Sequence, residues 1–472
     1  MEKQMSEITR RDFVKATGAA TAIAATTLPA WAIQDSETTL RIGLIGCGGR
    51  GTGAANQSLT ANKDAVIWAM GDAFEDRLRG SMSALVGEKG KRGEVPRERQ
   101  FVGFDAFQKV IDSDVDMVIL TTPPHFRPEH IAAAVKAKKH VFCEKPMAVD
   151  GMGVRSVMES TKLAKENDTN LMSGFCWRYN LPLRATYEQI HQGNIGEVRS
   201  VFASYYTTPL WTKPRKPQWS DMEWQMRNWV HFDWLSGDHI VEQACHSIDK
   251  INWAMKNVAP VSATSIGGRQ MHEGPETGNI YDHFGVVFEY EDGRHAHLHC
   301  RQMPFCYNDN NDYITGSTGT CAVNCWTGAP EFKGSSSWTY QGENPNMYQV
   351  EHDELHEAIR GNRPTVNDGH FMAQSTMMAI LGREAAYTGQ RVSYEDALGS
   401  TTQLGPKEYA FTDYPIPPIA APGTTKLNRL DTTVQTLDTL PSKSDDSMDD
   451  PYGIGPAGKA RLEEIRRKYQ DP

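Results

Sequence analysis

Three side chains in the middle of the chain have the chemistry of proton transfer: Lys145, Glu242 and His246. Glu242, His246 and Asp249 recur at helical spacing, so a helix over this stretch would present them on one face. Histidine acts as a base near pH 7 with little adjustment of its pKa. A lysine beside a cationic group has a depressed pKa and can donate a hydrogen bond to a hydroxyl. This set suits proton removal from an alcohol, although the helix spacing also fits a solvated polar face with a capped histidine.

A glycine-rich turn near the start of the chain is the second feature that could take part in such chemistry. Gly46, Gly48 and Gly51 fit the pattern G-x-G-x-x-G, and an apolar run from Leu40 precedes them. Where a buried strand turns into a helix, this pattern lets the backbone approach a dinucleotide pyrophosphate, which then faces the helix N-terminus. Alone the pattern is weak evidence, because glycine-rich turns are common.

The choice of dinucleotide depends on an acid further along. Asp72 follows the next apolar run and lies 21 residues beyond Gly51, where a carboxylate can bind the adenosine ribose hydroxyls. A carboxylate there repels a 2′-phosphate, so the sequence favours NAD. Arg77 and Arg79 are close enough to leave NADP open, and Asp72 also fits the N-cap of a helix.

Other candidate residues lie where further predicted strands end, and ligands of parallel sheets bind beyond the carboxyl ends of the strands. The remaining residues expected to contact the dinucleotide are Cys47, Gly49, Arg50, Thr122, Pro123, His125, Glu144 and Lys145. The residues expected to bind the substrate are Arg178, Tyr179, Trp229 and Asp249. No metal site is expected, since Cys321 and Cys325 have no second Cys/His pair nearby.

Two domains are predicted from the order of elements. Between residues 38 and 168, apolar strands alternate with helices, which predicts a Rossmann domain with a doubly wound parallel sheet. Between 169 and 395, six strand candidates follow one another with few helices between them. This region therefore predicts an α+β domain with a large, mostly antiparallel sheet. The stretch 211–234 is rich in tryptophan and is typical of a carbohydrate-binding wall.

The two ends of the chain differ from the domains. Residues 1–32 contain Arg10-Arg11, a mildly apolar segment and an A-x-A site, the pattern of a twin-arginine export signal. A periplasmic or secreted protein, exported folded, is therefore expected. Residues 396–472 form a Pro- and Ser/Asp-rich extension, with a short helix expected at 456–469. The net charge of −10 argues against a nucleic-acid partner, and no membrane anchor is expected after processing.

Taken in order, the glycine turn, the acid after the second strand, Thr122-Pro123-Pro124-His125 and Glu144-Lys145-Pro146 resemble the Gfo/Idh/MocA oxidoreductase family over residues 38–395. The resemblance implies that Lys145 lies beside the nicotinamide and the substrate hydroxyl and that His246 is the general base. Glu242 stands where most members have aspartate, so its reach is open. The resemblance also implies a tightly held cofactor in exported members, and a homodimer or homotetramer formed through the open face of the second sheet.

Three functions follow from these residues. The leading hypothesis is hydride transfer between bound NAD(H) and a secondary hydroxyl of a sugar, glycoside or polyol. The second is an NAD-dependent glycosidase that oxidises C3 of a sugar transiently, eliminates the aglycone, adds water and reduces the sugar again. The third is a non-catalytic sugar-binding protein.

Overall fold

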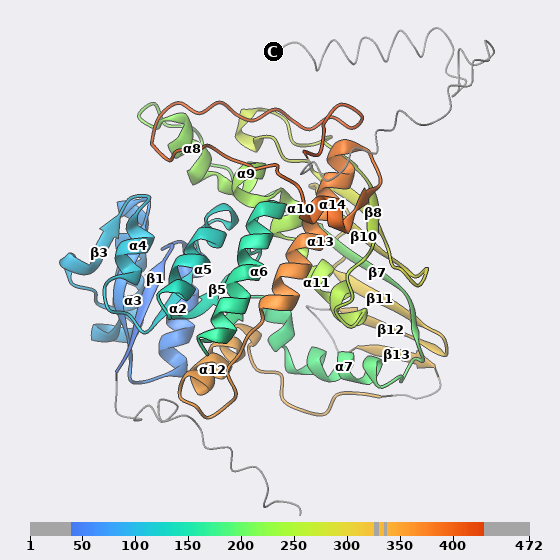
Figure 1. The fold of residues 1–472 in the computed structure, drawn as a ribbon, viewed down its shortest axis with the longest axis horizontal. Helices are drawn as coiled ribbons and strands as arrows, with labels where there is room; N and C mark the ends of the chain where they lie inside the picture. The colour runs from blue at the N-terminus through green and yellow to red at the C-terminus, as the bar shows by residue number, and fades with distance from the viewer. Residues whose placement is uncertain (1–38, 325–329, 335–337, 429–472) are drawn as a thin grey trace, which may run out of the picture.

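Two sheets organise the protein, a parallel sheet of six strands and a mostly antiparallel sheet of eight (Figure 1). The computed structural model describes residues 39–324, 330–334 and 338–428. The expected fold, a Rossmann domain followed by an α+β domain, is confirmed. The expected export signal (1–32) and terminal helix (456–469) lie outside the described residues.

The N-terminal sheet has the order β3-β2-β1-β4-β5-β6, and every pair in it is parallel. Its strands and helices are β1 (Leu40–Ile45), α2 (Gly49–Ala61), β2 (Ala65–Asp72), α3 (Glu75–Lys89), β3 (Gln100–Val102), α4 (Ala106–Ile111), β4 (Met117–Leu120), α5 (Arg127–Lys136), β5 (His140–Cys143), α6 (Gly151–Glu166) and β6 (Leu171–Ser173). Strand β6 extends this sheet past residue 168, the expected boundary. The stretch from Glu75, whose polar composition resembles a surface loop, begins with a 15-residue helix whose first turn carries two acids.

The second sheet has the order β13-β12-β11-β7-β10-β9-β8-β14, and β7–β10 is its one parallel pair among the described residues. The elements of this half are α7 (Leu181–His191), β7 (Val198–Thr207), α8 (Asp221–Arg227), α9 (Asp233–Ser236), α10 (His239–Glu242), α11 (Cys245–Ala254), β8 (Ser262–Gly268), β9 (His283–Glu289), β10 (His295–Gln302), β11 (Asn311–Gly316), β12 (Gly319–Asn324), β13 (Glu331–Gly334), α12 (Met347–Ile359), α13 (Gly369–Thr388), β14 (Val392–Ser393) and α14 (Tyr394–Leu398).

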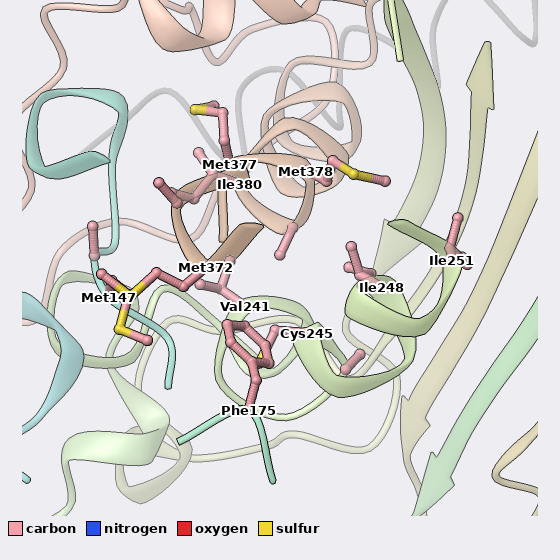
Figure 2. Packing of buried hydrophobic residues seen from close by; sticks show 14 of the residues in the cluster. Met147, Phe175, Val241, Cys245, Ile248, Ile251, Met372, Met377, Met378 and Ile380 are labelled. Atoms are coloured by element: carbon pink, nitrogen blue, oxygen red, sulfur yellow. The ribbon is translucent and has the colours of Figure 1, made fainter. Parts of the chain in front are cut away.

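Helix α13 packs at the centre of the molecule. It packs on α10 and α11, where Val241, Cys245 and Ile248 are fully buried, and Met372 and Met147 belong to the same cluster (Figure 2). Flexible methionine side chains fill irregular gaps between packed elements. The short helices that carry Glu242 and His246 are thus fixed from behind by a rigid core.

The chain after the second sheet returns to the first domain. Helix α12 packs on α2, and the His356 ring contacts the Ser58 hydroxyl at 2.6 Å. Past α14, the segment up to residue 428 runs as coil over α8 and α9 (Figure 1). In the described part of the chain, no helix has both the length and the apolar character that a bilayer crossing requires.

Candidate active site

The glycine turn between β1 and α2 is shaped by close backbone contacts. Gly46 has a positive φ of 94°, and a Cβ there would lie 2.6 Å from the backbone of Thr121. A Cβ on Gly51 would lie 2.0 Å from the Gly46 carbonyl oxygen. In contrast, a Cβ on Gly48 or Gly49 would have no neighbour within 4 Å. The turn therefore packs tightly on one side and is open on the other.

The open side of the turn faces a cavity of about 550 Å³, which falls in the usual size range of ligand sites. The N-terminal domain lines it with the glycine turn and with the carboxyl ends of its strands, and the second domain supplies the opposite wall. The predicted residues on its wall are Gly46, Gly48, Gly49, Arg50, Gly51, Asp72, Thr122, Pro123 and Trp229. Backbone N–H groups at the start of α2 and the open glycines fit a pyrophosphate.

Asp72 joins the glycine turn to the cavity. Its carboxylate accepts hydrogen bonds from the backbone N–H of Cys47 at 2.6 Å and of Phe74 at 2.9 Å. Burial raises the pKa of this carboxyl, while the two backbone hydrogen bonds oppose the rise. Asp72 therefore positions the turn and also presents an acid at the end of β2.

Arg50 links three elements at the inner end of the cavity. Its Nε lies 3.0 Å from Oε1 of Glu144, at the end of β5, and its guanidinium lies 5.0 Å from the ring centre of Tyr348 on α12. Glu144 does not line the cavity itself. It holds Arg50, and so reaches the site through that side chain.

Lys145 and Glu242 form an ion pair beside the end of β5. The Lys145 Nζ lies 3.0 Å from Glu242 Oε1 and also donates to the Glu242 carbonyl oxygen. That carbonyl faces the lysine at the point where α10 ends, three residues before α11 begins at Cys245. Burial alone would lower the pKa of Lys145, but the Glu242 carboxylate raises it above its usual value. Glu242 therefore reaches the lysine, and the expected lowering of the lysine pKa concerns a lysine that lies beside a cationic nicotinamide.

His246 lies in the first turn of α11 with its ring edge toward Phe175. Its Nδ1 is buried and has no hydrogen-bond partner among the described residues. Burial, with the charges of Lys145 and Lys250, lowers its pKa well below the usual value. This shift favours the neutral form of the ring, which is the form that can accept a proton.

Comparison with known proteins agrees with this geometry. Residues 40–175 match a family described as an oxidoreductase family with an NAD-binding Rossmann fold, and residues 183–322 match the GFO/IDH/MocA C-terminal domain. Together the two matches span more than half of the 472 residues. The chain belongs to the Gfo/Idh/MocA oxidoreductase family. Its N-terminal domain is an NAD-binding Rossmann domain.

Two curated relatives share part of this Gfo/Idh/MocA chain. A 2,7-anhydro-N-acetylneuraminate hydratase of Escherichia coli (strain K12) is 26% identical over 230 residues, which cover 48% of this chain and 57% of the relative. A myo-inositol 2-dehydrogenase of Thermotoga maritima is 34% identical over 158 residues, which cover 34% of this chain and 42% of the relative. The chain thus spans about half the length of these two relatives.

Two solved structures of the same fold cover more of the chain. An aldose-aldose oxidoreductase from Caulobacter crescentus, complexed with glycerol, has a TM-score of 0.59 at 18% identity and covers 75% of this chain and 99% of its own. The WlbA dehydrogenase from Bordetella pertussis, in complex with NADH and UDP-GlcNAcA, has a TM-score of 0.57 at 19% identity and covers 75% and 98%. At these identities the likeness shows the fold.

Several predicted site residues lie elsewhere. Arg178 and Asp249 form a buried ion pair, with Nε 2.8 Å from Oδ2, and the Tyr179 hydroxyl donates to Asp368. These three expected substrate contacts hold the domain core together instead. Trp229, also expected at the substrate, lies on the nucleotide cavity wall.

Two expected cofactor contacts also point away from the cavity. The Cys47 side chain is buried, with its Sγ 3.5 Å from the Gly71 carbonyl oxygen. The His125 ring contacts the Tyr409 hydroxyl at 2.7 Å and meets Trp234 edge to face. Cys47 therefore packs against β2, and His125 packs against α9 and the C-terminal coil.

Sequence reasoning missed side chains that come together only through the fold. Tyr205 on β7 is near enough to Lys145 and Glu242 for their charges to act on its hydroxyl, whose pKa burial raises to about 12. The nucleotide cavity is also lined by the aromatic residues Phe74, Phe104, Phe107, Phe126 and Trp211. Most of these residues follow the ends of β2, β3 and β4. Their position after a strand end is the feature of the sequence that could have identified them.

Proposed function

We propose that this Gfo/Idh/MocA protein transfers a hydride between NAD(H) and a secondary hydroxyl of a sugar, glycoside or polyol. The observation that carries the proposal is the 3.0 Å ion pair between Lys145 and Glu242. Lys145 follows β5, which pairs with β4, and the residues after the carboxyl end of β4 line the nucleotide cavity. A protonated lysine and a neutral histidine then flank the place where an alcohol would react.

The residues of the chain divide the proton chemistry between them. NAD+, when bound in the cavity, would supply the hydride acceptor for the alcohol carbon. Lys145, held protonated by Glu242, donates a hydrogen bond to the alcohol oxygen. His246, held neutral, accepts the hydroxyl proton. In the reverse direction the same histidine returns the proton to the oxygen.

Relatives support a carbohydrate or polyol as the substrate class. Proteins similar to this chain are named for inositol, an anhydro sugar acid and aldoses. The tryptophan-rich stretch does not support the sugar directly, since Trp211 and Trp229 line the nucleotide cavity. The substrate class therefore depends on the relatives and on the Lys145, Glu242 and His246 set.

The experiment is a panel of sugars, glycosides and polyols, scored by NADH absorbance in one turnover of protein loaded with NAD+. We expect at least one secondary alcohol to reduce the cofactor, and Lys145→Met to slow that step by about a hundredfold. Lys162→Met, which removes an exposed lysine on α6, is the matched control. The proposal fails if no alcohol reduces the cofactor, or if both variants behave alike.

A second candidate is catalysis without net oxidation. The similarity to a protein named as a hydratase favours it, because NAD can oxidise a sugar transiently so that a leaving group departs and water adds. Release of nitrophenol from a nitrophenyl glycoside without NADH accumulation would decide for this reading. Stoichiometric NADH in a single turnover, with no aglycone released, would decide against it.

We also propose that a second copy of the chain covers the open face of the eight-stranded sheet. Ile266 is 78% exposed and Tyr313 40% exposed on this face, where the Phe202 ring stacks on Tyr313 and meets His299 edge to face. Such an apolar face is rarely left in water. Sedimentation should show a dimer or tetramer, and Ile266→Glu should shift it toward the monomer.

The cellular location is the last part of the proposal. Arg10 and Arg11 with the A-x-A motif support export by the twin-arginine route to the periplasm. Fractionation of cells should recover the processed protein outside the cytoplasm, and replacement of both arginines by lysine should retain it inside. Recovery of the unprocessed chain from the cytoplasm in both cases would contradict export.

A further inference from the structure

A second cavity, of about 480 Å³, lies on the other side of the segment that walls the nucleotide cavity, and its size is that of a ligand site. The two cavities share no lining residue. In the coil before α8, Trp211 and Lys213 line the nucleotide cavity, whereas Thr212 and Pro214 line the second one. Side chains that alternate in this way point to opposite sides of the chain, as in a strand. The segment is therefore a partition, and the second space is here called the outer cavity.

Three segments far apart in the sequence form the walls of the outer cavity. The first is residues 212–225, which include most of α8, the second is the short turn Pro275–Thr277, and the third is the C-terminal coil at Ile416. The first and third walls are joined directly, because the Gln225 amide donates to the Tyr414 carbonyl oxygen at 2.6 Å. The outer cavity is thus a product of the tertiary fold.

The turn that carries Glu276 is held in place by its neighbours. The Arg269 guanidinium donates to the Gly278 carbonyl oxygen at 2.6 Å and to the Thr277 hydroxyl at 2.9 Å. A Cβ on Gly278 would lie 1.9 Å from the His231 carbonyl oxygen, so the end of the turn packs closely on the segment before α9. The Glu276 carboxylate therefore reaches the outer cavity from a fixed backbone.

The charged groups of the outer cavity leave one carboxylate without a partner. Asp221 Oδ1 lies 2.6 Å from Arg215 Nη2, so these two charges compensate each other. The Arg215 guanidinium also lies 5.6 Å from the ring centre of Trp224. In the part of the chain that the structure describes, Glu276 has no cation within ion-pair distance. One net negative charge therefore faces the outer cavity and attracts a cation.

The rest of the lining suits a hydroxylated ring. Apolar surface comes from four side chains, those of Pro214, Trp224, Pro275 and Ile416. The C–H faces of a sugar ring pack on such surfaces. The Thr212 hydroxyl and the Arg215–Asp221 pair line the same cavity, and these groups can donate to and accept from sugar hydroxyls. A mostly apolar wall with a few polar groups is the usual composition of a small-molecule site.

We propose that the outer cavity binds a sugar that carries a protonated amino group. The Glu276 carboxylate accepts hydrogen bonds from the amino group. Thr212, Arg215 and Asp221 bind the ring hydroxyls, and the apolar side chains pack on the face of the ring. This site is separate from the candidate active site, and binding to it does not depend on the proposed hydride transfer.

The test compares four small ligands that separate the charge from the hydroxyls. Glucosamine has both an ammonium group and ring hydroxyls, glucose has only the hydroxyls, cyclohexylamine has only the charge, and glucuronate carries the opposite charge. Ligand-observed NMR titration of the purified protein, loaded with NAD+, gives a dissociation constant for each. We expect glucosamine to bind about three- to tenfold more tightly than glucose or cyclohexylamine, and glucuronate to bind least.

Variants of Glu276 test the site itself. Glu276→Gln should weaken glucosamine binding about three- to tenfold, and Glu276→Lys should reverse the preference, so that glucuronate binds more tightly than glucosamine. Both substitutions are at an exposed position of a turn, so the fold is retained. Glu273→Gln, at an exposed acid of the same loop that does not line the cavity, is the matched control and should stay within about twofold of wild type.

Three outcomes would overturn the inference. The first is equal affinity of wild type and Glu276→Gln for glucosamine, or no binding of glucosamine by either. The second is loss of binding in Lys145→Met with Glu276→Gln unchanged, which would assign the sugar to the candidate active site instead. The third is equal binding of cyclohexylamine and glucosamine, which would show that the outer cavity takes amines without regard to the sugar ring.

Discussion

The pKa values of Lys145 and His246 are shifted in opposite directions. Glu242 raises the pKa of Lys145, whereas burial, with the charges of Lys145 and Lys250, lowers the pKa of His246. Two titratable groups whose pKa values are pushed apart commonly divide the roles of acid and base. At the residue scale burial acts first on the histidine, and the charges of Lys145 and Lys250 add to the same downward shift of its pKa.

Replacing Glu242, the acid of this ion pair, should slow the oxidation of the alcohol. Glu242→Gln leaves the Lys145 charge nearly buried with a neutral partner, so we expect the rate of NADH formation to fall about 10- to 100-fold. Glu242→Asp keeps the charge but is one methylene shorter, so its rate should lie between those of glutamine and wild type. Single-turnover kinetics on the best alcohol of the panel measures both. A Glu242→Gln rate equal to wild type would show that the ion pair is dispensable.

The pH dependence of alcohol oxidation should show the low pKa of His246. The reaction requires the neutral ring, and a depressed pKa keeps the ring neutral as the pH falls through 6.5. We therefore expect kcat/KM to stay constant at pH 6.5 and to decline only well below it. Lys145 remains charged, so no loss is expected up to its usual pKa of 10.5. A midpoint at or above pH 6.5 would contradict this assignment, and His246→Gln should remove the decline altogether.

At the element scale, the sequence predicted the sheet better than the helix that carries the site. Apolar runs and the glycine pattern report local geometry, and the apolar run from Leu40 before the glycine turn is strand β1 in the structure. The spacing of Glu242 and His246 predicted one helix, but the chain breaks between α10 and α11. Asp238, at a positive φ of 74°, accepts hydrogen bonds from the Tyr281 N–H and the Tyr387 hydroxyl. These tertiary contacts fix α10 separately, and no local pattern could report them.

Substitutions of Gly51 and of Gly48, two glycines of the same turn, should affect different properties of the protein. Gly51→Ala forces a Cβ to within 2.0 Å of the Gly46 carbonyl oxygen, so we expect a loss of about 1–3 kcal/mol in the free energy of unfolding. Gly48→Ala has open space and an ordinary φ of −74°, so its stability should change by less than about 0.5 kcal/mol. Its methyl group would nevertheless stand where the pyrophosphate approaches, and NAD affinity should fall. Denaturant unfolding and calorimetric NAD titration separate the two effects; equal stabilities would contradict the close packing.

At the scale of the whole molecule, three segments far apart in the sequence meet at His125. Its own turn follows β4, Trp234 comes from α9, and Tyr409 comes from the C-terminal coil. The sequence predicts that His125 lies at a strand end and that a Pro-rich extension follows residue 395, but not that the extension covers His125, because Pro-rich segments carry no periodic pattern. His125, which the sequence predicts to contact the cofactor, instead joins the Rossmann domain, the second domain and the C-terminal coil. These contacts are here called the joint.

This joint predicts that the folded protein loses stability in mild acid. Burial lowers the pKa of His125 from 6.5 to about 4, so between these values the unfolded chain binds a proton that the folded one excludes. Stability due to the neutral ring is full above pH 6.5 and is lost as the pH falls toward 4. Because one pKa unit is worth about 1.4 kcal/mol, lowering the pH from 6.5 to 5 should cost about 2 kcal/mol at this residue.

Urea unfolding at both pH values measures the loss in wild type and in His125→Gln, which cannot take up the proton. His295→Gln, at an exposed position on β10, is the control and should keep the wild-type slope. If His125→Gln lost as much stability as wild type between the two pH values, the ring would not be the group that titrates, and the joint would have to be held by contacts indifferent to its charge.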